Sequence, residues 1–221
     1  MKTIQIFFQK PFAKIGAVAL VIVIICALAW RPLQVLNLQA RAGSRIDAYI
    51  ETHAEPASHF LACQMPLLID LPEDQGLAEA VDLLDKAWDY KPFQAHTAYL
   101  LGRACCLEGE YRQAIEAFSA TTEFNPENPK GAIEAAYAHL NLAAEALQDD
   151  DRVFHQEQAV LLLSGAGYSF DYFLIQGREA FEDRAYPTAW LSYLTAALFE
   201  PLPADAAIQL ELLSEAREPW Y

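Results

Sequence analysis

The residue types that could bind metals or transfer protons are few and scattered along the 221 residues. The five histidines stand at positions 53, 59, 96, 139 and 155. The densest group of potential zinc ligands comprises Glu51, His53, Glu55 and His59, in a sequence typical of a polar connector. Asp149, Asp150 and Asp151 could attract a divalent cation, but acids in this place also favour the N-terminus of a following helix. The sequence therefore predicts no metal site.

Catalytic motifs are also absent from the sequence. It contains no glycine-rich phosphate loop, no G-x-S-x-G and no H-E-x-x-H, the patterns of nucleotide, serine-hydrolase and zinc-protease sites. We therefore expect neither an enzyme nor a bound cofactor. The expected function is then the binding of another molecule by the folded elements.

Charge divides the chain into two unlike parts. The first 45 residues carry six Lys or Arg and no acid, a formal charge of +6. All thirty acids follow, against nine bases, which gives the remainder −21. Phosphate backbones should repel so acidic a body, so nucleic-acid binding is disfavoured. The basic N-terminus, in contrast, suits a lipid surface.

An uncharged run of sixteen residues, 15–30, lies in the basic part. A bilayer span needs about 20 apolar residues, which the flanking positions can supply. We predict a basic segment at 1–14 and a single transmembrane helix at 15–36, which would contact the lipid bilayer. The alternative is a signal peptide cleaved after Ala27-Leu28-Ala29, which would release a secreted protein. Three basic residues stand on each side of the uncharged run, but Lys10 and Lys14 lie nearer to it than Arg41 and Arg45, which favours an extracytoplasmic body in the cell membrane.

Four cysteines are present, none in a C-x-x-C pair. Cys26 falls in the apolar run. Cys105 and Cys106 are neighbours in a predicted helix, where they point about 100° apart and do not easily bridge each other. We expect the cysteines to act as small, buried hydrophobic residues. A Cys63–Cys106 disulfide in an oxidising compartment stays open as the alternative.

A repeated pattern determines the predicted fold. Residues 99–128 contain a Leu-Gly pair, an alanine, an aromatic residue four positions later and a proline after the helix end, at Leu101-Gly102, Ala114, Phe118 and Pro126. This arrangement resembles the tetratricopeptide repeat, a helix-turn-helix unit of 34 residues. The offsets recur at Gly177, Ala189, Tyr193 and Pro201, and part of the pattern stands 34 residues earlier at Ala80, Leu84 and Pro92.

The resemblance implies an all-α solenoid of helical hairpins at 73–221, with about three repeats, a preceding half and a C-terminal capping helix. The glycines and alanines should let facing helices approach closely, with Phe118 and Tyr193 filling the space between them. The prolines Pro66 and Pro72 argue against an ordinary helix before the half repeat. We therefore predict a stalk and irregular connector at 37–72.

In this family the first helix of each pair lines a concave groove that binds a peptide or partner protein. Matching the repeat to this sequence places eleven residues there: His96, Tyr99, Arg103, Cys106, Lys130, Ile133, Tyr137, Asn141, Asp171, Leu174 and Arg178. Arg103 and Arg178 each follow the repeat's glycine and could bind partner carboxylates, unless each pairs with a neighbouring acid such as Glu182. The predicted function is a membrane-anchored scaffold for a partner protein. The alternative is a permanent accessory subunit of a membrane complex.

Overall fold

The computed structural model describes residues 5–53, 60–92 and 94–216, and of residues 5–22 and 25–28 it describes the helix without the side chains. Within these ranges the chain forms helices and no strand, which confirms the all-α prediction. The elements are α1 (Gln5–His53), the short 3-10 helix η1 (Ala62–Gln64), α2 (Met65–Leu68), α3 (Gln75–Tyr90), α4 (Ala95–Leu107), α5 (Tyr111–Phe124), α6 (Lys130–Glu145), α7 (Asp149–Gly165), α8 (Phe170–Glu182), α9 (Tyr186–Phe199) and α10 (Ala204–Glu215).

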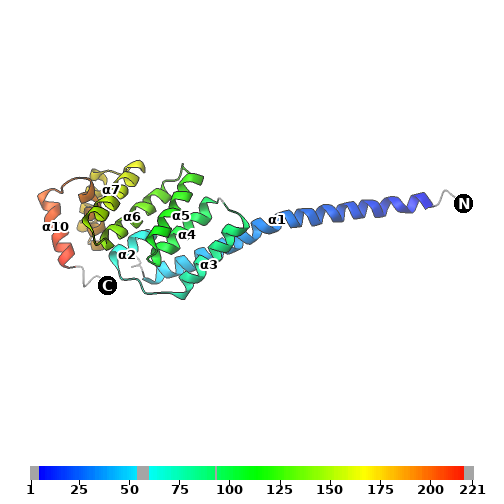
Figure 1. Ribbon diagram of the computed structural model, residues 1–221, viewed down its shortest axis with the longest axis horizontal. Helices are drawn as coiled ribbons and strands as arrows, with labels where there is room; N and C mark the ends of the chain where they lie inside the picture. Colours follow the sequence, from blue (N-terminus) through cyan, green and yellow to red (C-terminus); the bar gives the residue numbers. More distant parts are fainter. Residues whose placement is uncertain (1–4, 54–59, 93, 217–221) are drawn as a thin grey trace.

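Helix α1 dominates the outline of the molecule. Its 49 residues extend about 74 Å at 1.5 Å per residue. The N-terminal part projects alone from a body built by all other helices (Figure 1). Most side chains of the predicted span, 15–36, lie outside the described residues. Among the residues that are described, no helix is long and apolar enough to cross a bilayer.

The C-terminal part of α1 is a packed element of the body and not the predicted stalk. From Val35 onward its buried side chains recur every three or four residues, at Val35, Leu38, Ala42, Ile46 and Tyr49. They pack against the apolar face of α3 in one hydrophobic cluster. The physical reason is that α3 cannot bury its apolar face without a partner helix. The body therefore begins at Val35, where the predicted transmembrane helix was expected to end.

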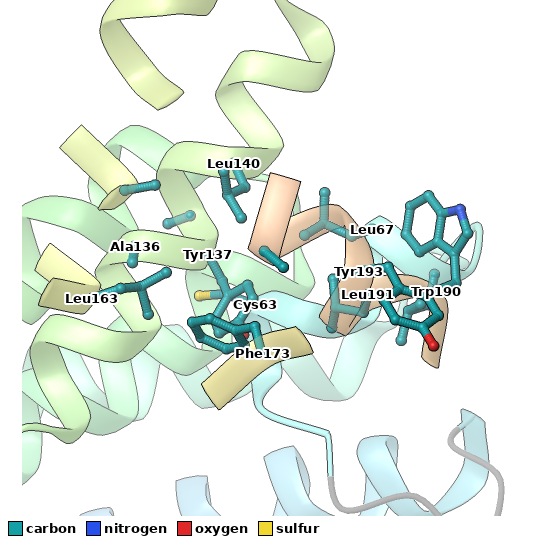
Figure 2. Packing of buried hydrophobic residues seen from close by; sticks show 14 of the residues in the cluster. Cys63, Leu67, Ala136, Tyr137, Leu140, Leu163, Phe173, Trp190, Leu191 and Tyr193 are labelled. Carbon is teal, nitrogen blue, oxygen red and sulfur yellow. The ribbon is translucent and has the colours of Figure 1, made fainter. Parts of the chain in front are cut away.

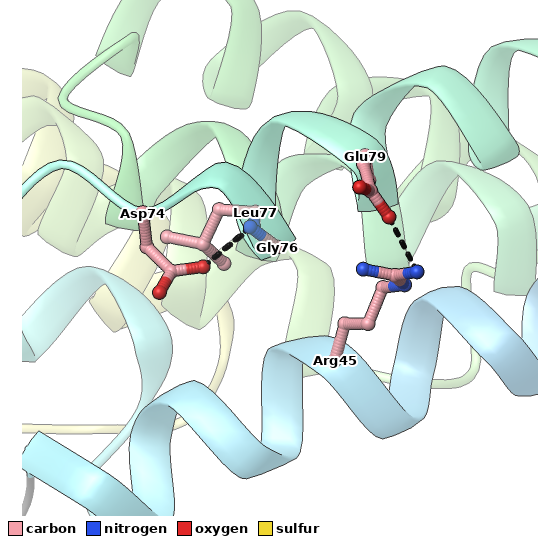
Figure 3. A network of polar contacts seen from close by, with 5 residues as sticks. All are labelled: Arg45, Asp74, Gly76, Leu77 and Glu79. Atoms are coloured by element: carbon pink, nitrogen blue, oxygen red, sulfur yellow. Dashed lines mark hydrogen bonds and ion pairs between the residues drawn. The ribbon is translucent and has the colours of Figure 1, made fainter.

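Polar contacts fix the register between α1 and α3. The Asp74 carboxylate accepts hydrogen bonds from the backbone N–H of Gly76 and Leu77, at 2.6 and 3.1 Å, and so caps the start of α3 (Figure 3). One turn further, Glu79 forms an ion pair with Arg45 of α1. The Tyr49 hydroxyl donates to the carbonyl of Pro72, at 2.8 Å. The two helices therefore run antiparallel.

Helices α4 to α9 form three successive hairpins, α4/α5, α6/α7 and α8/α9. In α4/α5 a Cβ added to Gly102 would lie 2.6 Å from the Phe118 ring. In α8/α9 a Cβ at Gly177 would lie 2.5 Å from the Tyr193 ring. Both rings are fully buried. The predicted close approach of glycine and aromatic residue is thus confirmed in both hairpins.

Residues 60–68, called the inserted segment below, form part of the core. They include η1 and α2, which contact α4, α6 and α9. Cys63, Met65 and Leu68 are at most 3% exposed. Figure 2 shows Cys63 and Leu67 between Tyr137 of α6 and Leu191 of α9. This part of the predicted irregular connector is therefore packed between α6 and α9, where it covers apolar surface of both helices.

The last helix, α10, closes the C-terminal end by packing on α9. Ala206 and Leu213 are its buried residues. The Trp190 indole N–H donates to the Ser214 hydroxyl at 3.0 Å, so that polar as well as apolar contacts fix α10.

Candidate functional site

An open cleft of about 510 Å³ lies between α1, α4 and the turn that precedes α6. Four predicted groove residues line it: His96, Tyr99, Arg103 and Lys130. The remaining lining is largely polar and comes from Gln39, Ala40, Gly43, Ser44, Asp47, Ala95, Leu100, Thr121, Asn125 and Asn128. The cleft thus presents cationic side chains and many hydrogen-bonding groups on a strongly acidic body.

One wall of the cleft is formed by the part of α1 beyond residue 36, which was predicted to be a stalk. Asp47 of α1 binds the Arg103 guanidinium at 3.1 Å, and this guanidinium lies 6.0 Å from the centroid of the Tyr99 ring. At the other end the buried Gln39 amide donates to Thr97 at 2.7 Å and to Gln94 at 3.0 Å. The missed signal was the apolar spacing from Val35 to Tyr49, which is visible in the sequence.

Tyr99 connects the cleft lining to a fully buried carboxylate, Glu134 of α6. Glu134 accepts hydrogen bonds from the backbone N–H of Ala62 and Cys63, at 3.3 and 3.0 Å. The Tyr99 hydroxyl forms a further hydrogen bond with it. Burial raises the pKa of the Glu134 carboxyl, while these bonds and the Arg103 charge act in the opposite direction. Glu134 therefore satisfies the free N–H groups at the start of η1 in place of a local cap.

Cys63 of the inserted segment makes two further contacts, one with α6 and one with α4. The Asn141 amide donates to the carbonyl of Cys63 and to that of Tyr137, both at 2.8 Å. Cys63 also forms a disulfide with Cys106 of α4, with their Cα atoms 5.1 Å apart. Of the two roles considered for these cysteines, the structure therefore has the disulfide and not a pair of separate buried thiols. Cys105 keeps a buried free thiol, whose pKa burial raises to about 12.

These contacts correct the predicted groove in its middle part. Cys106, Tyr137 and Asn141 are at most 4% exposed, because the inserted segment covers them. Leu174 of α8 is also buried, at 7% exposure. None of these four residues is available to a partner in this structure.

The remaining predicted residues lie outside the cleft. Ile133 borders a separate hollow of about 550 Å³ whose aromatic wall is formed by Tyr137, Tyr168, Tyr172 and Phe173. Asp171 is exposed in the first turn of α8. Arg178 is exposed and binds Asp205 of α10 at 2.8 Å, in place of the expected neighbour Glu182. Both arginines thus pair with an acid, Arg103 with Asp47 of α1 and Arg178 with Asp205 of α10, but only Arg103 lines the cleft.

The histidines do not assemble a metal centre within the described residues. No three His, Cys, Asp or Glu side chains come together there in a way that could hold a metal ion. His139 and His155 do meet across α6 and α7, with their Nδ1 atoms 2.9 Å apart. Burial, followed by the His155 charge, lowers the pKa of His139 to about 4, so this pair is a neutral hydrogen bond. Glu55 and His59 lie outside the described residues.

Asp149, Asp150 and Asp151 form the first turn of α7, where their charges favour the helix dipole. Arg152 binds Asp149 at 2.6 Å. The three acids are therefore accounted for by the helix that they begin.

Comparison with models of known protein families gives no match to this chain, and comparison with curated proteins gives no significant match.

Proposed function

We propose that this protein is a membrane-anchored scaffold of the tetratricopeptide kind that binds a partner protein in the cleft between α1 and α4. The observation that carries the proposal is the cleft itself. Four residues expected to face a partner line one open cavity, and two of them, Arg103 and Lys130, are cationic although residues 46–221 carry a formal charge of −21. Carboxylate groups of a partner would complement this lining.

The repeat assignment is supported by the two hairpins that share a glycine-to-aromatic contact, Gly102 with Phe118 and Gly177 with Tyr193. The hairpins follow one another along the chain, and α10 covers the last of them. A capped row of hairpins buries its apolar faces between neighbours and leaves one surface for a ligand.

The membrane anchor is supported by the uncharged run at 15–30 and by the helix that carries it away from the body (Figure 1). An extracytoplasmic location of the body is supported by the Cys63–Cys106 disulfide, because such bonds persist in oxidising compartments and are rare in the cytosol. In this arrangement the N-terminus lies inside the cell and the cleft faces a partner outside it.

The test compares two arginines that stand at equivalent positions of the proposed repeat. Arg103 lines the cleft, whereas Arg178 lies outside it. Crosslinked affinity purification from native membranes would measure the partner recovered with wild type, Arg103→Glu and Arg178→Glu. We expect Arg103→Glu to reduce recovery at least tenfold, because it places a repulsive charge in the cleft. Arg178→Glu should leave recovery unchanged, because Arg178 lies outside the cleft and pairs with the exposed Asp205 of α10.

The same purification separates the scaffold from a permanent accessory subunit. A scaffold should also be recovered as a free, folded chain, whereas a permanent subunit should be recovered with its partners in fixed stoichiometry. The intact mass of the recovered chain reports whether residues 1–29 are retained. Equal partner recovery with both arginine variants would exclude the cleft as the binding surface.

A further inference from the structure

The register between α1 and α3 determines which end of the body faces the N-terminal part of α1. Glu79 of α3 lies opposite Arg45 of α1, and the helices run antiparallel. Both rise by about 1.5 Å per residue, so the level of Tyr90, about eleven residues beyond Glu79, corresponds to that of Gln34. Figure 1 shows the end of α3 on the side from which α1 projects. Tyr90 and Lys91 therefore lie level with the last turn of the predicted span.

The exposed face of α1 changes character at the same level. Trp30, Leu33 and Leu36 are between 59 and 62% exposed, although all three are large and apolar. The exposed Arg31 lies among them, and its long side chain can reach the membrane interface. Beyond them the exposed positions of α1 are polar or small: Asn37, Ala40, Arg41, Ser44, Asp47, Ala48, Glu51 and Thr52. An exposed apolar band that ends where polar residues begin is typical of the edge of a membrane-embedded helix. This edge lies about one turn from the level of Tyr90.

We propose that the end of α3, at Tyr90 and Lys91, rests on the bilayer surface, with the Tyr90 ring in the headgroup region. The proposal depends on the proposed anchor and adds the surface that meets lipid. Tyr90 is 46% exposed and Lys91 is exposed, and tyrosine and lysine are side chains suited to this interface. The occupant is a zwitterionic lipid surface, because the net charge of the body opposes anionic headgroups.

The continuity of α1 gives this contact its rigidity. The helix runs unbroken from Gln5 to His53, and its side chains are buried in the body from Val35 onward. No connector therefore separates the proposed span from the body. The cleft begins at Gln39, about 7 Å further along α1 than Gln34. Its partner would consequently be bound close to the membrane.

The experiment measures membrane depth by electron paramagnetic resonance in phosphatidylcholine nanodiscs. Single nitroxide labels are placed on the full chain with Cys26 and Cys105 replaced by Ala and the disulfide intact. Tyr90→Cys and Lys91→Cys report the proposed contact. Glu73→Cys is the matched control, because it lies just before the opposite end of α3, about 25 Å away. Ile24→Cys reports the anchor itself.

We expect the label at position 24 to be accessible to oxygen and shielded from a water-soluble nickel complex. Labels at 90 and 91 should show intermediate values, and the label at 73 should behave as in water. If 24 is embedded while 90 and 91 match 73, the lipid-contact proposal is wrong and the anchor stands. If 24 also matches 73, the anchor and the contact both fail.

Discussion

The close contact between Gly102 and Phe118 gives a quantitative test of the hairpin packing. A Cβ at position 102 would lie 2.6, 2.7 and 2.8 Å from three atoms of the Phe118 ring, which is fully buried. Overpacking of this kind costs about 1–3 kcal/mol, against about 1 kcal/mol gained from the helix propensity of Ala. We expect Gly102→Ala to lower the free energy of unfolding by up to about 2 kcal/mol, the difference between these two effects.

The assay is urea unfolding followed by circular dichroism, with Gly165→Ala as the matched control. Nothing lies within 4 Å of a Cβ at Gly165, so this variant should gain up to about 1 kcal/mol. The double variant Gly102→Ala with Phe118→Leu should be less destabilised than the sum of its two single changes, because the smaller side chain relieves the overlap. If Gly102→Ala were as stabilising as Gly165→Ala, the proposed close packing of α4 on α5 would be refuted.

Two further predictions concern the cysteines and the histidine pair. The Cys63–Cys106 bond closes a loop with a sequence separation of 43, so its loss should cost about 4 kcal/mol in the chain-entropy account. Reductant should therefore lower the melting temperature of wild type and Cys105→Ala but not that of Cys63→Ser; insensitivity of wild type would contradict the bond. The lowered pKa of His139 makes the neutral pair with His155 stabilising above about pH 6.5, and this contribution is lost as the pH falls toward 4. Between pH 7.5 and 5, wild type should lose about 1–2 kcal/mol more than His139→Gln, after allowance for solvent screening; equal losses would argue against the pair.

Local spacing was sufficient to predict that helices follow the connector. The helical region was predicted to begin at residue 73, and α3 begins at Gln75. The glycines at 102 and 177 indicated close helix contacts, and each lies against an aromatic residue of the same hairpin. These features depend on residues within one hairpin, so a short window of sequence contains them.

The partner of α3 was missed because it is not the preceding segment of chain. Prolines at 66 and 72 argue against an ordinary helix directly before α3, and for this reason the sequence predicts an irregular connector there. Helix α3 instead packs against α1, and the inserted segment lies between these two helices in the sequence. The apolar positions from Val35 to Tyr49 have helical spacing and could have indicated this partner.

The burial of the groove's middle could not be derived from local patterns. Glu134 and Asn141 bind backbone groups 71 to 78 residues away. A carboxylate on a predicted concave face gives no sign that it will accept N–H groups from a distant 3-10 helix. The pairing of Cys63 with Cys106, in preference to the adjacent Cys105, likewise depends on which side of α4 meets the inserted segment.

The most direct test of the account is the comparison of partner recovery between Arg103→Gln and Arg178→Gln in native membranes. These neutral substitutions remove the charge without introducing a repulsive one, and each breaks one exposed or half-buried ion pair. The cleft account predicts that Arg103→Gln lowers the recovered partner several-fold, while Arg178→Gln matches wild type. Two results would contradict binding in the cleft: a loss of the partner only with Arg178→Gln, or unchanged recovery with both variants.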